Sequence, residues 1–172
     1  MEPHSGRIIK AGHIKATAVE HVIVASEAER AELAARLGLP GVSHLRGVFV
    51  LRHEQGGVIA AELHMKARVE QVCVVSLEPF PADVEERSAL RFVPASHFAE
   101  AEALELDEHS LEAPDEIPYA GDVIDLGEAL AEQLALALEP YPRKPGAALP
   151  EAASDDVVTP FSVLALRKSA PE

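Results

Sequence analysis

The sequence has few aromatic residues and a single cysteine. Aromatic side chains make up 4% of the 172 residues and tryptophan is absent, so the core must consist mostly of leucine, valine, isoleucine and alanine. The lone cysteine excludes an internal disulfide and is typical of a reducing compartment. No apolar run approaches the roughly 20 residues of a membrane-spanning helix, and the N-terminus shows no signal pattern. We therefore expect a soluble, cytoplasmic protein.

The sequence also lacks the patterns that mark common enzyme sites. It has no G-x-S-x-G, P-loop or G-x-G-x-x-G motif, and its eight histidines show no metal-binding spacing. Cys73 lies among valines on a predicted strand, where a buried core thiol is expected rather than a nucleophile. The carboxylates come in runs, which usually form a solvated face. We predict no enzymatic activity, no metal, no cofactor and no small-molecule substrate.

Negative charge is concentrated in one segment. The formal net charge is −14 at pH 7, and residues 99–139 contain 13 acidic residues but no lysine or arginine. Such crowding weakens the compact state by repulsion, which indicates either a surface for a basic partner or a means of staying soluble. The predicted partner surface consists of Glu102, Glu105, Asp107, Glu108, Glu128, Glu132 and Glu139.

Alternating apolar and polar residues predict an antiparallel sheet of about five strands. Strands are expected at 8–9, 19–25, 42–53, 58–77 and 84–92, and glycines at 56–57 predict a hairpin turn. Gln71 interrupts the apolar alternation of the longest strand, so we expect a bend there or a stretch covered on both faces. Pro79-Phe80-Pro81 is expected to turn the chain, with Phe80 plugging the core edge.

The strongest helical pattern runs from Asp125 to Glu139. Asp125 suits the N-cap, Glu128 follows three residues later, and Pro140 ends the helix. The predicted apolar face consists of Leu126, Ala129, Leu130, Ala131, Leu134, Leu136, Ala137 and Leu138, and should pack on the sheet face that carries Leu63, Met65 and Val69.

A second, short helix is predicted near the N-terminus. Ser26 and Glu29 form a capping-box pattern, and Gly38 is a suitable C-terminal stop. The chain is thus predicted to form one α+β domain over residues 1–146, with an acidic insert at 99–124. A flexible linker and a short tail are expected at 147–172.

Six cations lie at polar positions of the predicted strands, which face solvent on one side of the sheet. They are Arg46, Arg52, Lys66, Arg68, Arg87 and Arg91. Strand pairing would gather them into one basic field suited to phosphate. The alternative, which we favour on the residues alone, is cross-strand pairing with Glu62, Glu70 and Glu85.

Two blocks of the sequence resemble one known family. Cys73–Phe80, CVVSLEPF, resembles the central motif of the YceD family, the large ribosomal RNA subunit accumulation proteins, and Asp125–Gly146 is similar to the family's second block. The motif positions are Cys73, Leu77, Glu78, Pro79, Phe80, Asp125, Leu126, Glu128, Glu132, Gln133, Leu134, Pro140, Tyr141, Pro142 and Arg143. Many relatives carry C-x-x-C where this chain has Cys73-Val74-Val75-Ser76, so neither a zinc site nor a redox pair is expected here.

The resemblance implies a non-enzymatic role in large ribosomal subunit biogenesis. Two kinds of partner remain open. The six cations would bind large-subunit rRNA or an assembly intermediate, whereas the acidic segment would screen a small basic ribosomal protein. Glu78 is the motif residue with no evident structural role, which makes it a candidate for function.

Overall fold

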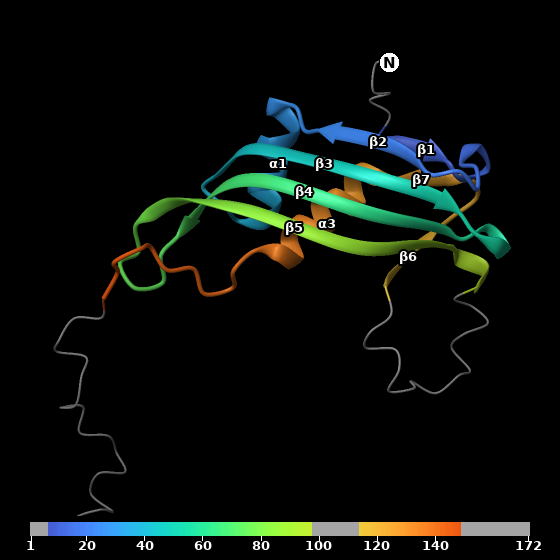
Figure 1. Ribbon diagram of the computed structural model, residues 1–172. Helices are drawn as coiled ribbons and strands as arrows, with labels where there is room; N and C mark the ends of the chain where they lie inside the picture. The colour runs from blue at the N-terminus through green and yellow to red at the C-terminus, as the bar shows by residue number, and fades with distance from the viewer. Residues whose placement is uncertain (1–6, 98–113, 149–172) are drawn as a thin grey trace, which may run out of the picture.

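The computed structural model describes residues 7–97 and 114–148, and within them it shows an α+β fold (Figure 1). The elements in chain order are β1 (Ile8–Lys10), the 3₁₀ turn η1 (Ala11–His13), β2 (Val19–Val24), α1 (Glu27–Leu37), β3 (Gly41–His53), η2 (Gln55–Gly57), β4 (Ile59–Val72), β5 (Pro79–Pro94), β6 (Asp115–Tyr119), β7 (Val123–Asp125) and α3 (Leu126–Ala137). The predicted fold class, with a five-stranded sheet, an early short helix and a late helix, is confirmed. The insert residues 98–113 and the tail residues 149–172 lie outside the described residues, so the predictions made for them stay predictions.

The main sheet has the strand order β2-β3-β4-β5-β6, and β1 and β7 form a separate two-stranded sheet. Strands β2 to β5 are antiparallel neighbours, as predicted. The fifth strand differs, because β6 runs parallel to the end of β5, with Leu90 opposite Asp115 and Pro94 opposite Tyr119. A parallel pair needs a crossover connection, and residues 95–114 provide it.

The connection between β4 and β5 also differs from the prediction. β4 ends at Val72 rather than Leu77, and Pro79 already lies in β5, directly opposite Val72. The turn is therefore made by residues 73–78, and the Pro79-Phe80-Pro81 triplet belongs to a strand. Pro79 and Pro81 are tolerated because no described strand pairs with β5 there on the side away from β4, which makes that side an edge.

Gln71 does not bend the strand. The register of β4 on β5 is continuous from Ile59 to Val72, and the Gln71 side chain is buried on the core face. Its Nε2 donates a hydrogen bond to the carbonyl oxygen of Glu139 at 3.2 Å. The buried amide thus has a hydrogen-bond partner in the chain just beyond α3, and avoids the cost of an unpaired buried polar group.

Both helices lie on the same face of the main sheet, behind it in Figure 1. Leu130 and Leu134 of α3 are at most 1% exposed, and they share one core with Leu63, Met65 and Val69 of β4. The close approach of α3 depends on Gly47 of β3, because a Cβ built there would lie 2.7 Å from Leu130 Cδ1. The predicted packing of the leucine row on the sheet is therefore present.

The helix ends follow local sequence signals. Ser26 and Glu29 form the predicted capping box of α1, and Gly38 closes the helix in the left-handed conformation. Asp125 caps α3 by accepting hydrogen bonds from the N–H groups of Gly127 and Glu128, at 2.9 and 3.0 Å.

The apolar face of α3 is narrower than predicted. Leu136 is 73% exposed and does not contribute to the core, whereas Gln133 is 5% exposed. The helix ends at Ala137, with Leu138 as its C-cap.

Candidate interaction surfaces

The face of the main sheet opposite the helices carries all six predicted cations, and no described element covers it. The strand registers place Arg46 beside Lys66 and Arg87 beside His64. Arg52 and Arg91 flank Ala60 of β4 from its two neighbouring strands. Arg68 lies between His44 and Asp83 on the same face. We call this surface the open face.

Four of the six cations on the open face form ion pairs. The pairs join Lys66 to Glu85 at 3.2 Å, Arg68 to Asp83 at 3.7 Å, Arg52 to Glu54 at 3.3 Å, and Arg91 to Glu54 at 3.4 Å and Glu116 at 3.3 Å. Glu85 is the one predicted acid that takes part, and hydrogen bonds from His64 and Lys66 lower its pKa. The predicted partners Glu62 and Glu70 form no ion pair with the described residues.

Arg46 and Arg87 have no carboxylate partner among the described residues. Arg87 borders a surface hollow of about 440 Å³ that is also lined by Val48, Val50 and Ala89. The described phenylalanines are buried in the core rather than on this face. The open face therefore offers cations to phosphate groups but no aromatic platform for stacking bases.

The two family-like blocks meet at one end of the sheet, which we call the motif junction: residues 73–80 together with residues 139–144. The N–H of Val74 donates to the carbonyl of Pro142 at 2.9 Å. Lys144 Nζ lies 2.8 Å from Glu78 Oε2. Two segments that are far apart in the sequence thus form one structural unit, with Phe80 buried beneath it.

Glu78 has structural contacts that the sequence did not reveal. Its carbonyl accepts a hydrogen bond from the Cys73 N–H at 2.9 Å, which closes the turn between β4 and β5. Its side chain pairs with Lys144, whose hydrogen bond and charge lower the pKa of Glu78. The Glu78 side chain thus has one structural contact, the exposed ion pair with Lys144, and its functional role stays a prediction.

The Cys73 thiol is fully buried within the junction. The Ser76 N–H approaches Sγ at 3.4 Å. Hydrogen bonding from the Ser76 side chain and from the backbone N–H groups of Ser76, Lys144 and Val75 lowers the pKa of Cys73 to about 6, against the effect of burial. No group of three or more metal-ligating side chains occurs among the described residues.

Apolar side chains project from the junction into solvent. Leu77 is 76% exposed, Tyr141 is 72% exposed and Val74 is 45% exposed. Leu77 also has a φ of 58°, a conformation that a leucine rarely adopts. Pro140 and Arg143 are exposed beside Tyr141, and Pro142 is half-buried.

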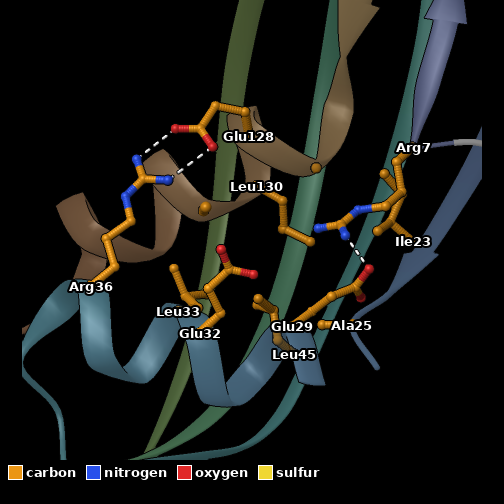
Figure 2. Close-up of a pocket in the computed structure, with 12 residues that line it drawn as sticks. Arg7, Ile23, Ala25, Glu29, Glu32, Leu33, Arg36, Leu45, Glu128 and Leu130 are labelled. Atoms are coloured by element: carbon orange, nitrogen blue, oxygen red, sulfur yellow. Dashed lines mark hydrogen bonds and ion pairs between the residues drawn. The ribbon is translucent and has the colours of Figure 1, made fainter. Parts of the chain in front are cut away.

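A cavity of about 160 Å³ lies between α1 and α3 (Figure 2). Leu45 and Leu130 line it, and the Arg36 guanidinium forms a two-pronged contact with the Glu128 carboxylate at 2.9 and 2.5 Å. Glu29 is held by Arg7 and by the capping box. Both carboxylates therefore have structural partners, and the cavity lies at a joint between the two helices.

The same contact changes the interpretation of the acidic surface. Glu128 is paired with Arg36, so a partner would have to compete with this exposed ion pair. Glu132 and Glu139 are exposed, and neither forms an ion pair with a described residue. The other predicted members, Glu102, Glu105, Asp107 and Glu108, lie outside the described residues.

A family model described as "Large ribosomal RNA subunit accumulation protein YceD" matches residues 61–160. The match covers more than half of the chain and includes both blocks of the motif junction. The chain belongs to the YceD family. The match begins within β4, so β2 and α1 precede the part that the YceD model recognises. Searches of curated proteins and of solved structures found no match.

The description of the YceD family assigns it to the accumulation of large-subunit ribosomal RNA. Within the described residues, no helix combines the length and apolarity needed to cross a membrane. The family description names no molecule that its members contact directly.

Proposed function

We propose that this chain is a non-enzymatic factor that supports the accumulation of large-subunit rRNA by binding the rRNA backbone, free or within an assembly intermediate. The observation that carries the proposal is the placement of six cations on one sheet face that no described element covers. Membership of the YceD family supplies the biological context.

The ion pairs on the open face do not prevent this role. Each pair is at least one-third exposed on both sides, and exposed ion pairs contribute only about 0–1 kcal/mol. A phosphate oxygen can replace a carboxylate oxygen at small cost, while Arg46 and Arg87 need no partner to be displaced. The lack of exposed aromatic residues on the described face favours contacts to phosphates over base readout.

Salt dependence of rRNA binding tests the proposal. The affinity for large-subunit rRNA fragments should fall as salt rises. Arg46→Gln and Arg87→Gln should each reduce the slope of log affinity against log salt by about one unit. Lys10→Gln, which removes the same charge from the two-stranded sheet, is the matched control and should leave the slope unchanged. Equal slopes for all four proteins would contradict binding through the open face.

A second candidate function is escort of a small basic ribosomal protein. It is favoured by the 13 acidic residues of segment 99–139, which has no compensating lysine or arginine. Replacing Glu102, Glu105, Asp107 and Glu108 by their amides should weaken binding to purified large-subunit proteins and leave rRNA binding unchanged. Stronger rRNA binding without loss of any protein partner would contradict the escort role and indicate a shield instead.

A further inference from the structure

Most of strand β5 has a neighbour on only one side. Strand β4 pairs with β5 along its whole length, from Val72 opposite Pro79 to Ile59 opposite Phe92. Strand β6 covers only Leu90 to Pro94 on the other side. Within the described residues, no strand pairs with residues 79–89 on that side. We call this stretch the free edge.

The direction of the backbone groups on the free edge follows from one hydrogen bond. The Cys73 N–H donates to the Glu78 carbonyl, so residue 78 points its backbone groups toward β4. Backbone groups alternate in direction along a strand, so Asp83, Glu85, Arg87 and Ala89 point theirs away from β4. The backbone of Pro79 and Pro81 also faces away from β4, but proline has no N–H to donate. The free edge therefore presents four unpaired N–H donors, from residue 83 to residue 89.

The charge along the free edge selects what can pair with it. Residues 79–89 contain Asp83, Glu85 and Glu86 against a single cation, Arg87. Asp83 and Glu85 pair with Arg68 and Lys66 of β4, but these pairs are exposed on both sides, so a basic segment can compete for the two carboxylates. A second copy of this strand would bring acid against acid, which is unfavourable between paired strands. The chain's own segment 98–113 contains six acidic residues and no lysine or arginine, and like charge disfavours pairing between such a sequence and the edge.

We propose that the free edge of β5, from Asp83 to Ala89, binds an extended lysine- or arginine-rich segment of a partner protein by strand addition. Main-chain hydrogen bonds to the four outward residues supply the affinity, and the acidic side chains select a basic segment. This inference goes beyond the proposed binding of rRNA, because it concerns the backbone edge of β5 and a protein partner. The free edge adjoins the open face and Arg87 belongs to both, but strand addition uses the main chain of Arg87 whereas rRNA binding uses its side chain.

Substitutions at Arg87 separate strand addition from simple charge attraction. Arg87→Pro removes one outward N–H and none of the hydrogen bonds to β4. Arg87→Ala removes the same side chain and keeps the N–H. The probe is a fluorescently labelled peptide of alternating lysine and valine, with an alternating glutamate and valine peptide as the charge control, measured by fluorescence anisotropy with the full chain.

Strand addition requires that the proline substitution weakens binding and the alanine substitution does not. Arg87→Pro should weaken binding of the basic peptide about tenfold, the loss expected when one main-chain hydrogen bond cannot form in the interface. Arg87→Ala should bind the peptide as tightly as the unaltered chain, or more tightly, because a like charge has been removed. Equal binding by both variants would overturn the proposal, since side-chain charge alone would then hold the peptide.

Amide hydrogen exchange gives a test that needs no variant. In the unaltered chain, the amides of Asp83, Glu85, Arg87 and Ala89 should exchange quickly and become protected when the basic peptide is added. Protection of these amides before peptide is added would overturn the proposal, because another part of the chain would then occupy the edge. No change on adding peptide would overturn it as well. The rRNA salt slope of Arg87→Gln is measured separately, so failure of one proposal is distinguishable from failure of the other.

Discussion

Leu77 has a backbone conformation that leucine rarely adopts, and its side chain points into solvent. A φ of 58° brings Cβ close to the backbone, which costs on the order of 1–3 kcal/mol for a residue other than glycine. The hydrogen bond from the Leu77 N–H to the Cys73 carbonyl, at 2.9 Å, holds this conformation in the turn. A strained and 76% exposed leucine does not improve the fold, so its side chain is a candidate for contact with a partner.

Replacing Leu77 by asparagine should stabilise the protein. Asparagine tolerates the left-handed region better than leucine, and no buried apolar contact is lost. We expect the free energy of unfolding to rise by up to about 1 kcal/mol, measured by denaturant titration. Val74→Asn, at a nearby exposed position without positive φ, is the control and should not stabilise. A loss of stability in Leu77→Asn would show that leucine is required by the turn itself.

Gly47 permits the closest contact between the main sheet and α3. A Cβ at this position would lie 2.7 Å from Leu130 Cδ1 and 3.3 Å from Leu63 Cδ1. Gly47→Ala should therefore lower the free energy of unfolding by about 1–3 kcal/mol, the usual cost of overpacking a core. Gly41→Ala is the matched control in the same strand, because its Cβ would meet only Glu70 Oε2 at 3.4 Å. Equal stability of the two variants would contradict the close packing.

Among the secondary-structure elements, α3 connects the main sheet, helix α1 and the motif junction. Its leucines pack on β4, its N-terminal turn contacts α1 through Glu128 and Arg36, and the chain after it forms half of the motif junction. The Arg36–Glu128 pair is about half exposed on both sides, so it positions the helices more than it stabilises them. Burial of Leu126, Leu130 and Leu134 contributes more than this pair, roughly 1.5–3 kcal/mol for each fully buried side chain.

Leu134→Ala should cost about 2–5 kcal/mol of unfolding free energy, because the side chain is fully buried and its removal leaves a cavity. Leu136→Ala, two residues along the same helix, removes a side chain that is 73% exposed. It should change stability by less than about 0.5 kcal/mol. Denaturant unfolding of both variants checks the prediction, and a Leu134→Ala protein as stable as its control would contradict the packing of α3.

For the molecule as a whole, acid should weaken the fold through several carboxylates at once. Backbone hydrogen bonding from Ser26 lowers the pKa of Glu29, and hydrogen bonds from Lys144 and Arg36 lower those of Glu78 and Glu128. A depressed pKa means that the stabilising contribution is complete above the ordinary value of 4.5 and is lost as pH falls through the folded-state value. The protein should therefore lose stability below about pH 4.5, although protonation also relieves repulsion in the acidic segment.

The substitution Glu78→Gln isolates the contribution of the motif junction to the pH dependence of the unfolding free energy. The stability difference between the unaltered chain and this variant should be present at neutral pH and shrink as pH falls below 4.5, the ordinary value for glutamate. Glu62→Gln, on the open face and without an ion pair among the described residues, is the control and should show no such trend. A difference that is constant from neutral to acidic pH would show that the Lys144 contact does not depend on the charge of Glu78.

Short-range patterns in the sequence determined the local elements. The capping box at Ser26 and the N-cap at Asp125 are present where the residues predicted them. The alternation of β4 holds as far as Val72, and the leucine row of α3 is buried at Leu126, Leu130 and Leu134. Each depends on interactions between residues a few positions apart, or on one face of one element, so a single sequence is enough to recognise it. Both blocks that resemble the YceD family could be recognised for the same reason.

Only the tertiary structure decided which distant segments meet. Lys144 and Glu78 are 66 positions apart, and Arg36 and Glu128 are 92 positions apart, so no local pattern predicts either pair. The parallel pairing of β6 likewise depends on the path of a crossover, and it leaves the free edge on β5. The cations on the open face pair with Asp83, Glu54 and Glu116 as well as the predicted Glu85. The register between strands selects these partners, and register is determined by packing of the whole core rather than by the residues that form the pair.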